Sequence, residues 1–348
     1  MKRKATAICL LAVMLLLSLS ACNKQSAFMT VEDKSVSKEL YTYYLDKVLS
    51  FPEEYGIEAG DRDAATESAA LCCKQYVASI KLMENEGITF SAMNKQLTAD
   101  KVEKLWSLYG RYYEKIGVGK PDITEAISHE YRIKQIIDYY YGPDGLEPTD
   151  DADLKEEFVD LYVGFRAISV PLTKTDSLGQ EVPLTETEKE EVMNVFRAYR
   201  TQINEGEKTI DEVNVAYNNS LDIIVTEALE INVVKIGDPM FTEDFYNTML
   251  EISHTRAGLI DCGNTLYLVQ REKIATTDDD EFYLYRSDLI EELKGEDAEK
   301  KVTELALTLS CEYDEETAEE IYGRLYEDKE KSDITDEEKT LIPKLKEE

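Results

Sequence analysis

The sequence predicts an α+β protein that is mostly helical, in which a small α+β module separates two helical segments. Over residues 37–161, apolar residues recur at three- and four-residue spacing, which is typical of helices that pack on one face. The spacing changes at Gly164, and residues 165–172 have the composition of a strand that ends at a proline. After the acidic residues 278–280, the helical pattern returns through Tyr326. We expect the two helical segments to pack together as one domain.

Residues 1–21 are predicted to be a lipoprotein signal peptide. Basic residues stand at positions 2–4, an unbroken apolar run covers residues 8–17, and Leu-Ser-Ala then leads to Cys22. The run is too short to cross a bilayer as a permanent helix, but it has the length of a secretory leader. Small residues before a cysteine are typical of the bacterial lipobox, in which the thiol is diacylated and becomes the new N-terminus. We therefore expect lipidation of Cys22 and tethering at the extracytoplasmic face of the membrane; an ordinary signal peptide with an incidental cysteine is the alternative.

The chain is strongly acidic. Its net charge is −33, and removal of the leader, which holds three basic residues and no acidic one, brings the mature chain to −36. This charge excludes nucleic-acid binding, because phosphate contacts need clusters of Lys and Arg. It also disfavours a protein body that lies on anionic lipid, so we expect membrane contact through the anchor. Basic unfolded segments fit this charge, although a solvated acidic coat explains it equally.

Residues 22–163 are predicted to form an N-terminal helical domain. Its helices are separated by stretches that contain glycine or proline, at residues 52–60, 87, 117–121 and 142–148. Two interpretations of its many tyrosines remain open. The rings either pack helix against helix, or they line a groove that binds extended apolar peptide without a sequence code. The tyrosines are Tyr41, Tyr43, Tyr44, Tyr109, Tyr112, Tyr113, Tyr139, Tyr140 and Tyr141.

Residues 164–274 are predicted to form the α+β module. A polar turn that contains Gly179 follows its first strand. Later, two apolar segments flank Cys262-Gly263-Asn264, which is the pattern of a β-hairpin. The other expected elements are helices over residues 186–204, 210–217 and 242–252, and the hairpin strands cover residues 258–261 and 265–271.

Residues 275–348 are predicted to be a C-terminal helical segment that returns to the first domain. The tail from about residue 327 is highly charged, so we expect it to fray.

The cysteines after the leader do not form a disulfide framework in a chain of this length. Cys72 and Cys73 are adjacent within a helical pattern and are expected to act as small buried hydrophobic residues. The sequence does not decide whether Cys262 and Cys311 form a disulfide bridge. Two histidines, with no cysteine at a suitable spacing, do not suggest a zinc site, so we expect neither a metal nor a cofactor.

Three stretches carry a family resemblance. Residues 28–37 look like an opening strand, turn and helix start, and Tyr139-Tyr140-Tyr141-Gly142 precedes a helix start at residues 149–158. In this order the chain resembles the SurA/PrsA-type extracytoplasmic foldases, whose parvulin-like (PpiC-type) prolyl isomerase domain is inserted in a chaperone domain. The lipobox at Cys22 matches the PrsA branch of Gram-positive bacteria. The resemblance implies a helical chaperone domain built from the N- and C-terminal segments, with a parvulin-like insert.

The resemblance is incomplete at the residues that would catalyse isomerisation. The first and last strands of the family each carry a histidine, and this chain has Ser169 and Tyr267 at those positions. Phe241 and Phe245 resemble the apolar pair that holds the substrate proline, whereas His254 matches neither family histidine. An isomerase must lower the barrier to cis/trans rotation of an X–Pro bond, which is about 18–20 kcal/mol, by favouring the twisted amide. A Ser–Tyr pair lacks the family's hydrogen-bonded centre, so the catalytic residues stay unassigned and we expect weak or absent isomerase activity.

The leading hypothesis is therefore a membrane-anchored extracytoplasmic folding factor, PrsA-like, that binds unfolded exported polypeptides. An active parvulin-type prolyl isomerase is the first alternative. A solute-binding lipoprotein is the second, although such proteins are built from repeated strand–helix alternation and this chain is mostly helical. By analogy with the family, the chain could form a homodimer through the helical domain.

Overall fold

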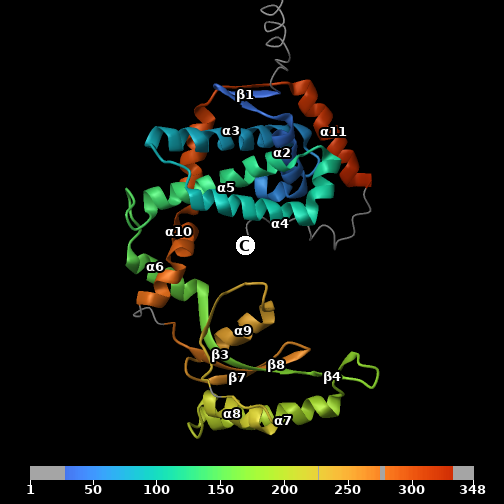
Figure 1. The fold of residues 1–348 in the computed structure, drawn as a ribbon, viewed down its shortest axis with the longest axis vertical. Helices are drawn as coiled ribbons and strands as arrows, with labels where there is room; N and C mark the ends of the chain where they lie inside the picture. Colours follow the sequence, from blue (N-terminus) through green and yellow to red (C-terminus); the bar gives the residue numbers. More distant parts are fainter. Residues whose placement is uncertain (1–27, 226, 275–278, 332–348) are drawn as a thin grey trace, which may run out of the picture. The chain divides into compact units, whose positions relative to one another are not determined.

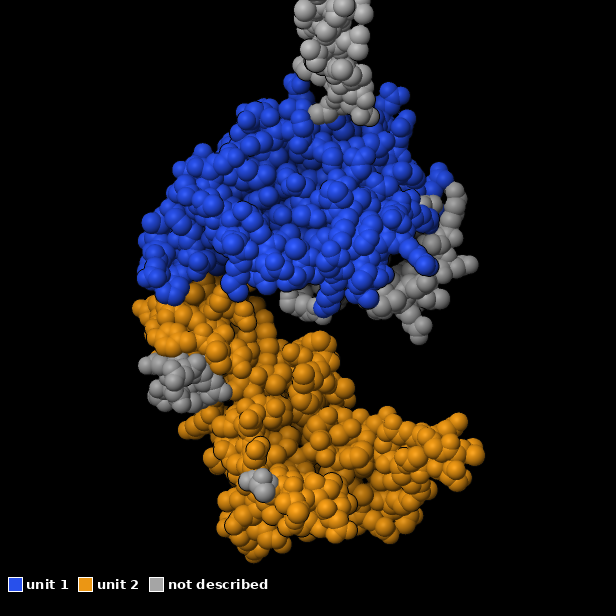
Figure 2. All heavy atoms as spheres, in the orientation of Figure 1, with its two compact units in different colours: residues 1–148, 294–348 blue, residues 149–293 orange. Residues whose placement is uncertain are grey.

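The computed structural model describes residues 28–225, 227–274 and 279–331. The predicted leader, the lipidation site Cys22 and the tail beyond residue 331 lie outside these ranges. The chain divides into two compact units, which are coloured separately in Figure 2. Unit 1 consists of residues 1–148 and 294–348, and unit 2 consists of residues 149–293. Among the described helices, none has both the length and the apolar character that a membrane crossing requires.

Unit 1 is mainly helical (Figure 1). Three of its helices begin at a polar residue whose side chain accepts a backbone N–H of the first turn: Ser37 before α2, Asp61 before α3 and Ser91 before α4. These caps explain why the helices begin where the sequence breaks predict. The elements are α2 (Lys38–Ser50), η1 (Pro52–Tyr55), α3 (Arg62–Glu86), α4 (Ala92–Ile116), α5 (Lys120–Tyr141) and α11 (Glu315–Lys331).

A three-stranded antiparallel sheet joins the two ends of the chain in unit 1. Its order is β2 (Lys34–Val36), β1 (Met29–Val31), β9 (Cys311–Tyr313). Within the same unit, Gln75 on α3 donates a hydrogen bond to Thr303 at 2.9 Å, and Thr303 belongs to α10 (Asp279–Thr308). The predicted fold class is thus confirmed: the N- and C-terminal segments form one mostly helical unit, and an α+β unit is inserted between them.

The tyrosines of unit 1 pack mainly in its interior. Burial raises the pKa of Tyr43 and Tyr44 well above the ordinary value, so both hydroxyls stay neutral. Tyr109, Tyr112 and Tyr139 are partly exposed. The interpretation as helix packing is therefore confirmed for the six buried rings, which are Tyr41, Tyr43, Tyr44, Tyr113, Tyr140 and Tyr141.

Unit 2 is built around a four-stranded antiparallel sheet in the order β6-β3-β8-β7. The predicted strands and hairpin appear as β3, β7 and β8, while β6 and the short hairpin β4–β5 were not predicted. The elements are α6 (Asp151–Leu161), β3 (Tyr162–Pro171), β4 (Thr173–Thr175), β5 (Glu181–Pro183), α7 (Glu186–Asn204), α8 (Ile210–Ser220), β6 (Asn232–Lys235), α9 (Glu243–Glu251), β7 (Ala257–Asp261) and β8 (Thr265–Glu272).

The inserted unit is longer than the predicted module of residues 164–274. Aromatic packing explains the extension at both ends. The ring of Phe158 on α6 lies 5.1 Å from that of Tyr162 and 6.1 Å from that of Phe282 on α10, measured between centroids. Tyr285 lies 5.0 Å from Tyr162. These contacts tie α6 and the first part of α10 to the start of β3.

The two faces of the sheet are covered by different helices (Figure 1). One face carries Ile168, Val170 and Leu268 and packs against α7 and α8 through residues such as Phe196 and Val213. The other face packs against α9. Because side chains alternate along a strand, the odd-numbered residues of β3 point toward α9. The residues of this second core include Val163, Phe165, Phe245, Tyr246, Met249 and Val269.

Candidate functional site

The structure brings the predicted site residues to the α9 face of the sheet. Ser169 on β3 lies directly opposite Tyr267 on β8 in the antiparallel register. Directly opposed residues of neighbouring strands present their side chains on the same face. Tyr267 packs with the α9 core, which also contains Phe241 and Phe245. The four residues named from the sequence are therefore gathered on one side of unit 2.

Aromatic rings connect these residues. Phe241 precedes the N-cap Thr242 of α9, and its ring stacks on Phe245 with centroids 4.1 Å apart. Tyr267 meets both rings nearly edge-on, at 5.9 Å from Phe241 and 5.5 Å from Phe245. Phe165, which the sequence analysis did not single out, lies 5.5 Å from Phe245. Phe165 lies four residues before Ser169, and because side chains of a strand alternate with a period of two residues, this spacing indicates that both residues share a face.

The exposure of the rings separates supporting residues from accessible ones. Phe245 and Phe165 are fully buried, whereas Phe241 and Tyr267 are half-buried and Ser169 is exposed. Phe245 therefore supports the ring above it and does not itself offer surface to a ligand. We call the accessible group of Ser169, Phe241 and Tyr267 the aromatic shelf. It combines two apolar ring surfaces with two hydroxyl groups, and both hydroxyls can donate and accept hydrogen bonds.

Neither histidine belongs to the shelf. His254 is exposed in the loop between α9 and β7, where partial burial and the charges of Arg271 and Lys273 lower its pKa. His129 lies in unit 1, with Nδ1 3.0 Å from the Ser79 hydroxyl. Burial and the charge of Arg132 lower its pKa to about 3, so it is neutral near pH 7. The shelf can therefore bind through apolar contact and hydroxyl groups but has no imidazole for proton transfer.

Within the described residues, β3 has an unpaired backbone edge beside the shelf. β6 pairs with β3 only from Tyr162 to Phe165, and the side chain of Asn232 donates to the carbonyl of Phe165 at 3.4 Å where this pairing ends. The N–H of Leu172 donates to Asn264, at the β8 side. Because backbone groups alternate along a strand, those of Ala167 and Ser169 point to the opposite side, beyond the end of β6. Such an edge can pair with another extended backbone.

A second, polar cleft lies on the other side of the sheet in unit 2. It has a volume of about 350 Å³ and is lined by residues that include Arg166, Asp211 and Glu272. The Arg166 guanidinium lies 3.1 Å from Asp211 and 3.6 Å from Glu272, so its charge is already matched by two carboxylates. This arrangement does not favour binding of a further charged ligand at Arg166.

The cysteines are free thiols in the described ranges. Cys73 is fully buried and Cys72 is partly buried, and burial raises the pKa of both thiols. Cys262 belongs to unit 2 and Cys311 to unit 1, and each is a free thiol. Within the residues that the structure covers, no cluster of three or more His, Cys, Asp or Glu side chains is placed to hold a metal ion.

Comparison with known proteins identifies similar solved structures, whereas no family model and no curated protein matches the chain. A foldase protein PrsA from Streptococcus pneumoniae is 12% identical, with 89% of this chain and 96% of that chain covered and a TM-score of 0.34. A foldase protein PrsA from Lactococcus lactis is 11% identical, with 86% and 99% covered and a TM-score of 0.37. A SurA-like chaperone structure from Campylobacter jejuni is 10% identical, with 83% and 99% covered and a TM-score of 0.27.

Proposed function

We propose that this chain is a lipid-anchored extracytoplasmic folding factor that binds unfolded, newly exported polypeptides. The observation that carries the proposal is the aromatic shelf beside the open edge of β3. An unfolded chain offers free backbone N–H and C=O groups together with exposed apolar side chains. Both find partners here: the backbone groups of Ala167 and Ser169 accept an added strand, and Phe241 and Tyr267 accept apolar side chains.

This mode of binding does not depend on a specific client sequence. Pairing at a strand edge uses main-chain hydrogen bonds that every extended peptide can make. The rings of Phe241 and Tyr267 supply apolar area at a low cost in conformational entropy, because each side chain has few rotatable bonds. The breadth of binding that this gives is what a protein that serves many exported clients needs.

Two sequence features support an extracytoplasmic location for this function. Lipidation of Cys22 would hold the protein at the extracytoplasmic face of the membrane, where exported chains emerge unfolded. The charge of −33 for the whole chain would repel the protein body from anionic headgroups and attract basic client segments. Release of the mature protein from its native host without detergent would contradict the anchoring part of the proposal.

The test of the holding function uses the mature chain and a chemically denatured client that aggregates on dilution. We expect an equimolar amount of the mature chain to reduce light scattering by the client. The control is an equally acidic protein of similar size, which separates binding from a general charge effect. Unchanged scattering in the presence of the mature chain would contradict the proposal.

Prolyl isomerisation is the second candidate, because Ser169, Phe241 and Tyr267 converge at one place. The hydroxyls of Ser169 and Tyr267 could bind a substrate carbonyl, but without histidines we expect a rate close to the uncatalysed one. A proline-peptide assay with the mature chain tests this expectation, and a rate clearly above the blank that Ser169→Ala abolishes would establish the enzyme. The solute-binding alternative loses its structural basis, since the sheets of the described residues are antiparallel and do not form two α/β lobes.

A further inference from the structure

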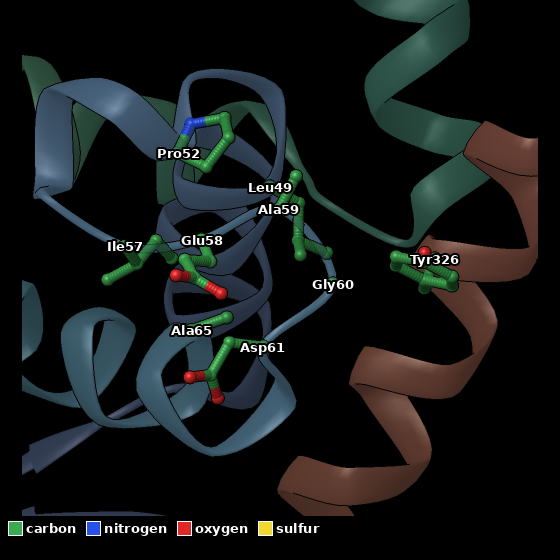
Figure 3. Close-up of a pocket in the computed structure, with 9 residues that line it drawn as sticks. All are labelled: Leu49, Pro52, Ile57, Glu58, Ala59, Gly60, Asp61, Ala65 and Tyr326. Atoms are coloured by element: carbon green, nitrogen blue, oxygen red, sulfur yellow. The ribbon is translucent and has the colours of Figure 1, made fainter.

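Unit 1 contains a small apolar pocket that the proposed function does not use. It lies between the loop that follows η1, the start of α3 and the late part of α11 (Figure 3). Its apolar walls include Leu49, Pro52 and Ile57, with Ala65 on α3 and the ring of Tyr326 across the opening. Residues from both ends of the chain thus build one site within a single unit.

The pocket is held in shape before any ligand binds. Tyr322 donates a hydrogen bond from its hydroxyl to the Gly60 carbonyl at 3.2 Å. The ring of Tyr322 stacks on Tyr326 at 5.5 Å with an interplanar angle of 13°. Gly60 has a φ of +87°, and a Cβ at this position would lie 3.3 Å from the Tyr326 hydroxyl. These contacts fix the loop against α11, so the pocket does not have to be assembled by its ligand.

The size of the pocket restricts the ligand to one side chain. Its volume is about 170 Å³. Sites for drug-sized molecules measure about 300–1,000 Å³, whereas a cavity of about 150 Å³ holds a benzene ring. A leucine, isoleucine or phenylalanine side chain fits this space.

The opening of the pocket is acidic. Glu58 and Asp61 line it, and both residues are exposed. The neighbouring cation, Arg62, lies 2.9 Å from Asp63 and 3.7 Å from Glu319, so its charge is directed to other carboxylates. An apolar side chain that enters the pocket therefore brings its chain neighbours next to two carboxylates. This favours a lysine or arginine beside the apolar residue.

We propose that this pocket binds a single large apolar side chain of an unfolded polypeptide, in a segment where lysine or arginine stands next to that residue. The inference rests on the proposed function and assigns it a second contact point, in the helical unit. Apolar burial provides the affinity, and the carboxylates of Glu58 and Asp61 select the cationic context. A small apolar molecule and a second copy of the chain are the other conceivable occupants, and the test below excludes them or identifies them.

The test is photo-cross-linking with the mature chain. The probe is a short Gly/Ser peptide that carries one photoreactive leucine analogue followed by lysine, and the attachment sites are mapped by mass spectrometry. We expect cross-links to residues of the pocket, such as Ile57 and Tyr326. Replacing the lysine of the probe by glutamate should weaken labelling about threefold. An unlabelled competitor peptide with serine at the leucine position should compete at least about tenfold more weakly than the corresponding leucine peptide.

Two substitutions test the pocket itself. Ala59→Trp, at an exposed lining residue, fills the space and should abolish labelling there while circular dichroism stays unchanged. Glu58→Lys should reduce labelling, whereas the matched control Glu54→Lys, an exposed residue of η1 that does not line the pocket, should not. Equal loss with both charge variants would show a general charge effect and overturn the inference.

The outcomes separate this inference from the proposed function. Suppression of client aggregation without any cross-link at the pocket would overturn the pocket and leave the folding factor. Cross-links at the pocket without suppression of aggregation would overturn the holding function and leave the pocket. Labelling that a small apolar molecule blocks but that does not depend on the lysine, or cross-links between copies of the chain, would assign the pocket to another occupant and overturn the inference.

Discussion

The helical core of unit 1 and the sheet of unit 2 both gather aromatic rings, but they cover these rings to different extents. In unit 1, Tyr41 stacks with Tyr313 on β9 at 6.3 Å and meets Phe28 at 4.9 Å, and Tyr41 is fully buried. In unit 2, Phe241 and Tyr267 remain half-buried above Phe245. The cover on that side is α9, which has nine residues, whereas α7 on the opposite face has 19. A short helix leaves part of a sheet face accessible, and this is where a ligand can bind.

Among the predictions that separate the two regions, the largest expected effect is on the free energy of unfolding when Tyr41 is replaced. Tyr41→Ala removes a fully buried ring and should lower the free energy of unfolding of unit 1 by about 3–5 kcal/mol. Tyr41→Phe keeps the ring and loses only the hydrogen bond from its hydroxyl to the Thr66 carbonyl, so it should cost about 1 kcal/mol. Urea unfolding followed by circular dichroism measures both values. A similar cost for the two variants would show that ring packing does not dominate in this core.

The second effect concerns pH and the two histidines. The pKa of His129 is about 3 in the folded protein, below its ordinary value of 6.5, so the unfolded chain binds a proton first as the pH falls. The stability of unit 1 should therefore decrease from pH 6.5 downward, by about 2 kcal/mol at pH 5 from this residue alone. His129→Gln should remove this part of the pH dependence. His254→Gln is the matched control, because His254 is exposed and its pKa is lowered less. If both variants change the pH dependence of stability equally, this dependence cannot be assigned to His129.

The regular elements of unit 2 could largely be predicted from the sequence. The helix predicted over residues 186–204 is α7, with the same bounds, because Thr185 and Glu188 form a capping box at its start. The first strand and the hairpin also appear where the pattern predicts them. In contrast, β6 has four residues and β9 has three, and segments this short show no usable period. β6 forms because the ten-residue strand β3 offers it a paired edge. β9 pairs with β1, which itself has three residues, so only the tertiary fold brings these two short strands together.

The site could be predicted only in part. The resemblance pointed to Ser169, Phe241, Phe245 and Tyr267, and the register then placed Ser169 opposite Tyr267. A spacing of four residues puts Phe241 and Phe245 near each other, but it does not tell which ring lies underneath. That depends on tertiary packing against Phe165. The pocket at Tyr326 was likewise missed, since its walls are separated by most of the chain.

A third prediction tests the open edge of β3. Ser169→Pro removes an N–H that points away from β8, so the paired ladder should remain intact and stability should change by about 1 kcal/mol or less. Client binding should weaken about fivefold, the equivalent of one lost hydrogen bond. Val170→Pro is the contrasting variant, because its N–H points toward β8 and the loss of this ladder hydrogen bond should destabilise unit 2 by about 1–3 kcal/mol. Unchanged client binding by a folded Ser169→Pro protein would remove strand addition from the proposal.

The smallest effect is expected at the hydroxyl of Tyr267, and it distinguishes holding a client from twisting its backbone. If the ring surface alone supports binding, Tyr267→Phe should bind an unfolded client within about twofold of the unaltered chain. Tyr267→Ala, which removes that surface, should weaken binding about fivefold or more. Binding is measured by the anisotropy of a labelled, permanently unfolded client. Prolyl isomerisation would place a different demand on the same residue, because polar groups must favour the twisted amide over the planar one. A large loss with Tyr267→Phe, as large as with Tyr267→Ala, would therefore show that the hydroxyl and not the ring surface dominates binding, and it would favour the enzymatic alternative.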